Sequence, residues 1–315
     1  MIRAFLITLI FFTILSFCAP LAQAQDQAST TTEQSQDKPA ETPEENKTED
    51  GGSNPESIDR SKIPIPLPID KSKQQDQDLK HYLTQAELQP MLAGTEEFIT
   101  LEQRSRTANS KGVVIFIPDW LQTPTNPKAI NFLRNQLPNL GWVTIALQPA
   151  DMPENFPSHA LESTEQLEQN QKALEQYQEK LMAKLTVLME KTQNYPGLLF
   201  VVTAGNHAGI LLDLYQQEKI EKPSAMLLLS SYSVIETEAI KLAQNVSESA
   251  FPVLDLYLSR DNKLAQSSAQ QRKVATDKTM KVFYRQKQLT SFKSGYYPQR
   301  TLLKEINGWF KSIGW

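Results

Sequence analysis

The stretch GLLFVVTAGNHAG, residues 197–209, decides the fold of this chain of 315 residues. It opens with an apolar run, residues 197–204, which is typical of a β-strand buried on both faces of a sheet. Gly205 and Gly209 follow, and they predict a tight turn and a close approach of the next element to the strand. The apolar spacing of residues 208–217 then predicts a helix. The stretch is therefore interpreted as a strand–turn–helix unit.

The same alternation of strand and helix continues on both sides of this unit. Further buried strands are predicted over residues 112–118, 141–148, 224–231 and 252–259, and helices over residues 127–137, 161–191, 236–246 and 300–313. A helix over residues 78–88, a half-exposed strand over 96–104 and a polar helix over 280–287 complete the prediction. This alternation predicts an α/β fold: a doubly wound, mostly parallel sheet with helices on both faces, a three-layer sandwich.

The helix predicted over residues 161–191 has an apolar stripe from Leu174 to Leu188, whereas its N-terminal part, residues 161–171, is far more polar. We interpret it as a crossover helix that lies on the sheet, with its polar first half projecting past the sheet edge. A partner surface of coiled-coil type is the alternative, although the apolar repeat is short for a coiled coil.

The centre of the Gly-x-x-x-Gly turn is His207. A nucleophile elbow carries Gly-x-Ser-x-Gly between strand and helix, so His207 stands where a hydrolase would have its serine. The predicted strand order resembles the α/β-hydrolase superfamily over residues 75–315. Three stretches, KGVVIFIPDWLQTP, LPNLGWVTIALQPAD and FPVLDLYLSRDN, more closely resemble a bacterial hydrolase-like family, the domain of unknown function number thirty-five thirty. That resemblance implies a fold and an exported location, but no activity.

The resemblance also implies that Asp261, in the stretch FPVLDLYLSRDN, matches the acid of a hydrolase triad. The base should be a histidine after the last strand, but the only histidines are His81, His159 and His207. Without a base, a serine hydroxyl is a poor nucleophile near neutral pH. The triad is therefore interpreted as degenerate, which argues against an ordinary serine hydrolase and leaves open whether the chain is an enzyme.

Five residues are candidates for binding a ligand at the carboxyl end of the sheet: Asp119, Trp120, His159, His207 and Asp261. Asp119 and Trp120 follow the first buried strand, where a hydrolase builds its oxyanion loop and where a carboxylate would repel an oxyanion. His159 lies in a Pro-rich loop. His207 is expected to be exposed on its turn, where the helix amino terminus favours the neutral imidazole and Asp261 favours the charged one.

Asp255 lies in the middle of an apolar strand, so it needs a partner if it is buried. No spacing of His, Cys, Asp or Glu matches a metal site, and no glycine-rich phosphate loop is present, so we expect neither a metal nor a cofactor. The net charge of −4 and the lack of a basic cluster argue against a nucleic-acid partner.

Residues 1–24 are predicted to be a signal peptide. Arg3 precedes an apolar run over residues 4–18, and the motif Ala-Gln-Ala that ends at Ala24 predicts cleavage before Gln25. The remaining chain has no apolar stretch long enough to span a bilayer. We therefore expect a secreted, periplasmic protein.

The composition divides the rest of the chain into three parts. Residues 25–62 form a low-complexity, acidic segment that is expected to be disordered, residues 63–74 a Pro-rich extended linker, and residues 75–315 the folded domain. The only cysteine, Cys18, lies in the signal peptide and follows the bulky Phe17, which argues against a lipoprotein signal. The mature chain would then contain no disulfide, in keeping with a bacterial periplasm.

Three functional hypotheses follow. The first is an exported, non-catalytic protein that binds a small molecule or an envelope component at the carboxyl end of the sheet. The second is a hydrolase of an ester-type or envelope substrate with an unconventional constellation, in which His159 or His207 acts with Asp119 or Asp261. The third is an interaction scaffold that uses the long helix and the acidic tail.

Overall fold

The computed structural model describes residues 69–120 and 122–315. These residues belong to a compact unit, Ile65–Trp315, that is distinct from Met1–Pro64. The predicted signal peptide, the acidic segment and residues 63–68 of the predicted linker lie outside the described residues. Within the described part of the chain, no helix combines the length and the apolar character needed to cross a membrane.

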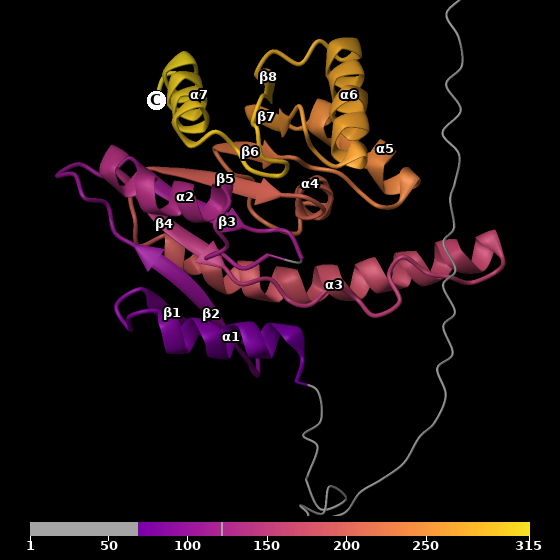
Figure 1. The fold of residues 1–315 in the computed structure, drawn as a ribbon, viewed down its shortest axis with the longest axis horizontal. Coiled ribbons are helices and arrows are strands. Elements are labelled where there is room, and N and C mark those ends of the chain that lie inside the picture. The colour runs from indigo at the N-terminus through magenta and orange to yellow at the C-terminus, as the bar shows by residue number, and fades with distance from the viewer. Residues whose placement is uncertain (1–68, 121) are drawn as a thin grey trace, which may run out of the picture. The chain divides into compact units, whose positions relative to one another are not determined.

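The domain is built on one sheet of eight strands in the order β1-β2-β4-β3-β5-β6-β7-β8. The strands are β1 (Leu88–Ala93), β2 (Glu96–Gln103), β3 (Gly112–Ile117), β4 (Trp142–Leu147), β5 (Leu198–Ala204), β6 (Ala225–Leu229), β7 (Val253–Leu258) and β8 (Tyr284–Leu289). Strands β3 to β8 are parallel, whereas β1 and β2 form an antiparallel edge beside β4 (Figure 1). The predicted mostly parallel sheet is confirmed.

Helices cover both faces of this sheet. One face packs against α3 (Ser163–Thr192), α4 (His207–Gln216) and α5 (Glu236–Glu248), and the other against α1 (Lys71–Tyr82), α2 (Ala129–Gln136) and α7 (Gln299–Ser312). Strand β3 shows why: Val113 and Ile115 point into the first layer, and Val114 and Phe116 into the second. Because both faces are buried, the strand is apolar at every position, as predicted for a three-layer α/β sandwich.

The predicted crossover helix over residues 161–191 is confirmed as α3. All of its buried side chains lie in its second half, from Tyr177 onward. The first half extends past the neighbouring helices, as Figure 1 shows.

Three local predictions were wrong. Residues 280–287, predicted to be a polar helix, contain the first part of β8, and α6 (Lys263–Lys278) was not predicted. The buried face of α6 consists mainly of small or polar side chains such as Ala265 and Arg272, so it lacks the aliphatic repeat that marks a helix. The helix predicted over residues 78–88 is shifted: α1 begins at Lys71, in the predicted linker, and β1 begins at Leu88. Only Leu79 of α1 is buried, so α1 has no apolar stripe.

A buried ion pair connects α6 to the sheet. Asp255 of β7 and Arg272 of α6 are both fully buried, and the guanidinium binds the carboxylate in a bidentate manner at 2.7 and 2.9 Å. Tyr284 and Gln286 of β8 also donate hydrogen bonds to Asp255, at 2.8 and 2.9 Å. The prediction that a buried Asp255 needs a partner is confirmed, and the partner comes from the helix that the sequence pattern did not reveal.

Candidate functional site

The turn after β5 has its strained position at Gly205. The strand ends at Ala204, Gly205 adopts a left-handed φ of +59°, and α4 begins at His207. In a nucleophile elbow, the catalytic residue is the one on the strained strand-to-helix turn. His207 does not have that place, since it is already the first residue of the helix. The position of the nucleophile belongs to Gly205, which has no side chain.

The carboxylate of Asp119 fills the space that a side chain at Gly205 would need. A Cβ atom added to Gly205 would overlap the Asp119 carboxyl group. Asp119 Oδ1 also accepts hydrogen bonds from the backbone N–H of Asn206, at 3.1 Å, and from its side-chain amide, at 3.3 Å. In a hydrolase, the N–H that follows the nucleophile helps to form the oxyanion hole. Here that donor is already bound by a carboxylate.

His207 is fully buried, so the expectation that it is exposed was wrong. Its Nε2 shares a hydrogen bond of 2.6 Å with the hydroxyl of Tyr177 from α3. Burial lowers the pKa of His207 to about 4, against the opposing effect of Asp119, so the imidazole is neutral at pH 7. The carboxylate that acts on the ring is Asp119, not Asp261 as expected from the sequence. The lowering of the pKa by desolvation is larger than the raising by Asp119, because the ring has lost contact with water. His207 is therefore a residue of the core.

Trp120 belongs to the same core region. Its ring lies edge-on to Phe156 and Tyr177, at centroid distances of 5.5 and 5.4 Å, and 5.7 Å from His207. Only 5% of the residue is exposed. Together, Trp120, Phe156, Tyr177 and His207 form an aromatic cluster that joins the β3 loop to α3 and α4. Trp120 therefore packs inside the protein rather than on a cleft wall.

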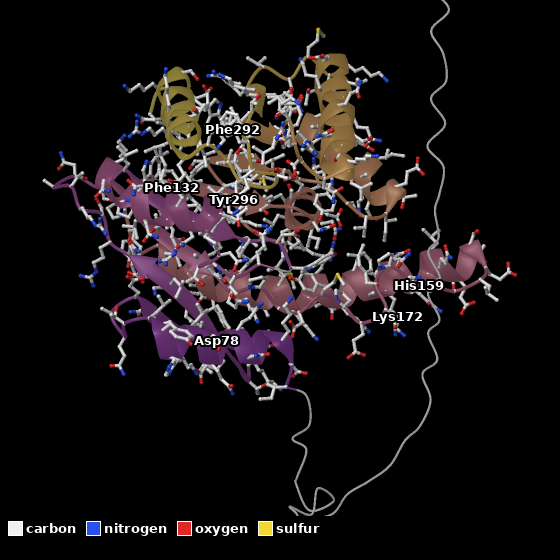
Figure 2. All side chains as sticks on the ribbon, viewed as in Figure 1. Asp78, Phe132, His159, Lys172, Phe292 and Tyr296 are labelled. Atoms are coloured by element: carbon white, nitrogen blue, oxygen red, sulfur yellow. The ribbon has the colours of Figure 1, made fainter. Side chains whose placement is uncertain are left out.

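His159 lies apart from the other candidates. It is exposed in the loop before α3 and lies near the projecting end of that helix, as Figure 2 shows. It is not among the residues that line the cleft at the carboxyl end of the sheet. Of the five candidate ligand-binding residues, the structure brings only Asp119 and Asp261 to that cleft.

The cleft itself has a volume of about 240 Å³ and lies at the carboxyl ends of β3, β5, β6 and β7. Its polar lining includes Asp119, Ser230, Tyr232, Asp261 and Tyr297. Lys128 contributes a basic group, and Gly205 forms part of the wall. This is the end of a parallel sheet at which α/β proteins bind their ligands.

Asp261 lies in the loop after β7, where the acid of a hydrolase triad is expected. Its Oδ2 accepts hydrogen bonds from the hydroxyl of Ser230 and from the backbone N–H of Leu258, the latter at 3.1 Å. Because the proton of Ser230 goes to Asp261, the Ser230 oxygen accepts from the Tyr297 hydroxyl at 2.6 Å, and the single Tyr297 proton is shared with the carbonyl of Leu256, which lies 2.8 Å from the same hydroxyl. Asp261, Ser230 and Tyr297 are thus joined in one hydrogen-bonded chain.

Tyr297 occupies the loop between β8 and α7, where the sequence lacks the histidine base. Burial raises the pKa of Tyr297 well above its usual value, so the phenol stays protonated and cannot serve as a general base at neutral pH. A carboxylate such as Asp261 is a weak base toward a serine hydroxyl. The chain of three residues therefore joins β6, the loop after β7 and the loop after β8, and it contains no histidine base beside Ser230.

From the sequence, Ser230 was placed only within the predicted strand over residues 224–231, and Tyr297 was not singled out. The available signal was positional: Ser230 ends a buried strand, and Tyr297 follows the last strand, as the missing base should. Among the described residues, no group of three or more His, Cys, Asp or Glu side chains is placed to hold a metal ion.

The eight-stranded sheet, the strand–turn–helix elbow after β5 and the acid position after β7 define an α/β-hydrolase-like protein. The esterase Est1E from Butyrivibrio proteoclasticus has the same fold, with a TM-score of 0.50 at 10% identity over 72% of this chain and 98% of the esterase. The carboxylesterase Cest-2923 from Lactobacillus plantarum WCFS1 also has a TM-score of 0.50, at 9% identity over 72% and 97% of the two chains. These similarities concern the fold.

The chain belongs to the family described as "Protein of unknown function (DUF3530)", whose family model matches residues 4–312. The family suggested by the three sequence stretches is thereby confirmed. Comparison with curated protein sequences gave no match.

Proposed function

We propose that this protein is a non-catalytic member of the α/β-hydrolase fold that binds a small molecule or an envelope component in the cleft at the carboxyl end of the sheet. The observation that carries the proposal is the place of Asp119. Its carboxylate fills the space of a nucleophile beside Gly205 and occupies the N–H of Asn206. A substrate carbonyl would meet a negative charge where an oxyanion hole should be, which raises the barrier to acyl transfer.

The lining of the cleft favours a polar ligand. The carboxylates of Asp119 and Asp261 accept hydrogen bonds, and the hydroxyls of Tyr232 and Tyr297 can accept or donate. The volume of about 240 Å³ is below the usual range of about 300–1,000 Å³ for sites that hold drug-sized ligands. A small amine- or hydroxyl-bearing molecule, or the end of a longer envelope component, fits this space.

We predict that the purified protein neither reacts with a fluorophosphonate probe nor hydrolyses short-chain nitrophenyl esters above the buffer rate.

Small polyols, amines and envelope-derived sugars are expected to include at least one compound that raises the melting temperature. Saturation at 100 times Kd stabilises by about 2.7 kcal/mol, or roughly 5–11 °C for a domain of this size.

Two variants assign these outcomes to the cleft. Asp261→Asn should weaken the thermal shift, whereas Glu190→Gln, on the exposed surface of α3, should leave it unchanged. Probe labelling or ester turnover that disappears in Ser230→Ala would contradict the proposal. Turnover that disappears in a His159 or His207 variant would favour the unconventional hydrolase hypothesis instead.

We also propose that the protein is exported to the periplasm and that Gln25 becomes its first residue. The support is the sequence pattern of residues 1–24. Amino-terminal sequencing of the protein purified from its native bacterium is expected to begin at Gln25. A lipid-modified Cys18, or an intact amino terminus, would contradict this proposal.

A further inference from the structure

The first half of α3 is an ordered platform that projects beyond the sheet. It has no buried side chain before Tyr177, and residues 163–176 extend over about 21 Å at 1.5 Å per residue. The preceding loop fixes it on one side, because the backbone N–H of Ser158 donates to Asn170 at 2.7 Å and Gln166 donates to the carbonyl of Ala160. This half of α3 therefore contributes little to the core of the domain and leaves its side chains accessible to another molecule.

A groove runs between residues 167–182 of α3, which include part of this half, and the helices α4 and α5. Its volume is about 480 Å³. Leu167, Leu174 and Met182 of α3 and Ile235 before α5 supply apolar side chains to its lining. Leu174, Met182 and Ile235 are partly buried against the core and keep only part of their surface toward the groove. Leu167 is 54% exposed. The apolar side chains of α3 are spaced seven or eight residues apart, so they form a stripe along one side of the helix.

Charge distinguishes this groove from an ordinary surface depression. Its lining carries four carboxylates, Glu175, Glu179, Asp213 and Glu238, against two ammonium groups, those of Lys219 and Lys241. Lys241 is already paired with Asp213, at 2.7 Å. In the part of the chain that the structure describes, none of the three glutamates forms a salt bridge within 4.0 Å.

Glu238 is a carboxylate of this groove that is partly removed from water. Burial raises the pKa of Glu238, and only Lys241 among its basic neighbours opposes this effect. A carboxylate that is partly removed from water without a direct cation is stabilised when a cation approaches it. A cation from outside the domain would provide that partner.

We propose that this groove binds a basic amphipathic helix of a partner protein, with its apolar face against the α3 stripe and its Lys or Arg side chains beside Glu175, Glu179 and Glu238. Helix-in-groove recognition uses apolar anchors one turn or two turns apart, which is the spacing that α3 offers. A second copy of α3 is a poor occupant, because its own projecting half is rich in glutamate and would repel these carboxylates. The proposal is independent of the cleft and of whether the protein is catalytic.

The test uses the whole chain and a fluorescein-labelled peptide of about 18 residues, five helical turns, with leucines on one face and lysines on the other. Fluorescence anisotropy is expected to show saturable binding that weakens at least tenfold when glutamates replace the lysines or when the sequence is scrambled. Binding should also weaken as salt rises, because the attraction between surface charges is screened.

Matched variants locate the binding. Glu175→Lys/Glu179→Lys and Leu167→Asp are each expected to weaken binding at least tenfold. Glu168→Lys/Glu190→Lys makes the same charge change on α3 outside the groove, and Leu161→Asp changes a leucine that is 99% exposed outside it. Both controls should bind as the natural protein does, and circular dichroism should show all four variants folded. Equal weakening by the controls, equal binding of the scrambled peptide, or no binding would overturn the proposal.

Discussion

Replacing Arg272 with methionine is expected to lower the free energy of unfolding by about 3–5 kcal/mol, since it leaves a buried charge without its partner. Asp255 and Arg272 are both fully buried. The guanidinium makes two bonds to the carboxylate and two more, at 2.7 and 2.8 Å, to the carbonyl of Ser231 and the hydroxyl of Ser268. Methionine fills much of the volume but satisfies none of these acceptors. The loss is measured by urea denaturation followed by circular dichroism.

Two further variants separate the buried charge from the general effect of losing an arginine. Arg285→Met removes a partly exposed pair with Glu305 and should cost at most about 1 kcal/mol. The double variant Asp255→Leu/Arg272→Met should recover part of the loss, because no unpaired charge remains. Recovery stays partial, since Tyr284 and Gln286 lose their acceptor. An Arg272→Met protein as stable as Arg285→Met would show that the pair contributes no more than a surface salt bridge.

Gly205→Ala is expected to lower the free energy of unfolding by about 2–5 kcal/mol. The left-handed φ of +59° costs an L-residue with a side chain about 1–2 kcal/mol, and forcing a methyl group into occupied space costs about 1–3 kcal/mol more. The occupied space belongs to the carboxyl group of Asp119. Asp119→Ala should relieve the overlap, so the two substitutions should be non-additive by at least about 1 kcal/mol.

Gly209→Ala is the matched control for this prediction. Gly209 was expected to allow a close approach of helix and strand, but a Cβ atom there would lie 3.8 Å from Cβ of Leu242, an ordinary contact. Because Gly209 lies within α4, alanine should leave the protein as stable or stabilise it by up to about 1 kcal/mol. Urea denaturation of the four variants tests both predictions. Strictly additive effects of Gly205→Ala and Asp119→Ala would contradict the overlap on which the proposed loss of catalysis rests.

The sequence by itself determined the class of fold. Strands β3 to β7 are apolar runs because helices cover both of their faces, and that burial is visible in the composition of each strand. The turn after β5 was visible through Gly205, because few residues other than glycine adopt a left-handed φ readily. Asp255 in an apolar strand predicted a buried partner. Each of these signals is local, because it lies in the residue types of a single segment and can be recognised without knowing which segments pack together.

Only the tertiary structure decided what the elbow can do. Asp119 and Gly205 are 86 positions apart, and they meet because β3 and β5 are neighbours in the sheet. Ser230 and Tyr297 come together for the same reason, through β6, β7 and the loop after β8. The sequence motif suggested that His207 lies exposed on the turn. In the structure His207 is the first residue of α4 and is buried, with its imidazole hydrogen-bonded to Tyr177 of α3. Contacts of this kind depend on strand order and on the docking of helices, which no local pattern encodes.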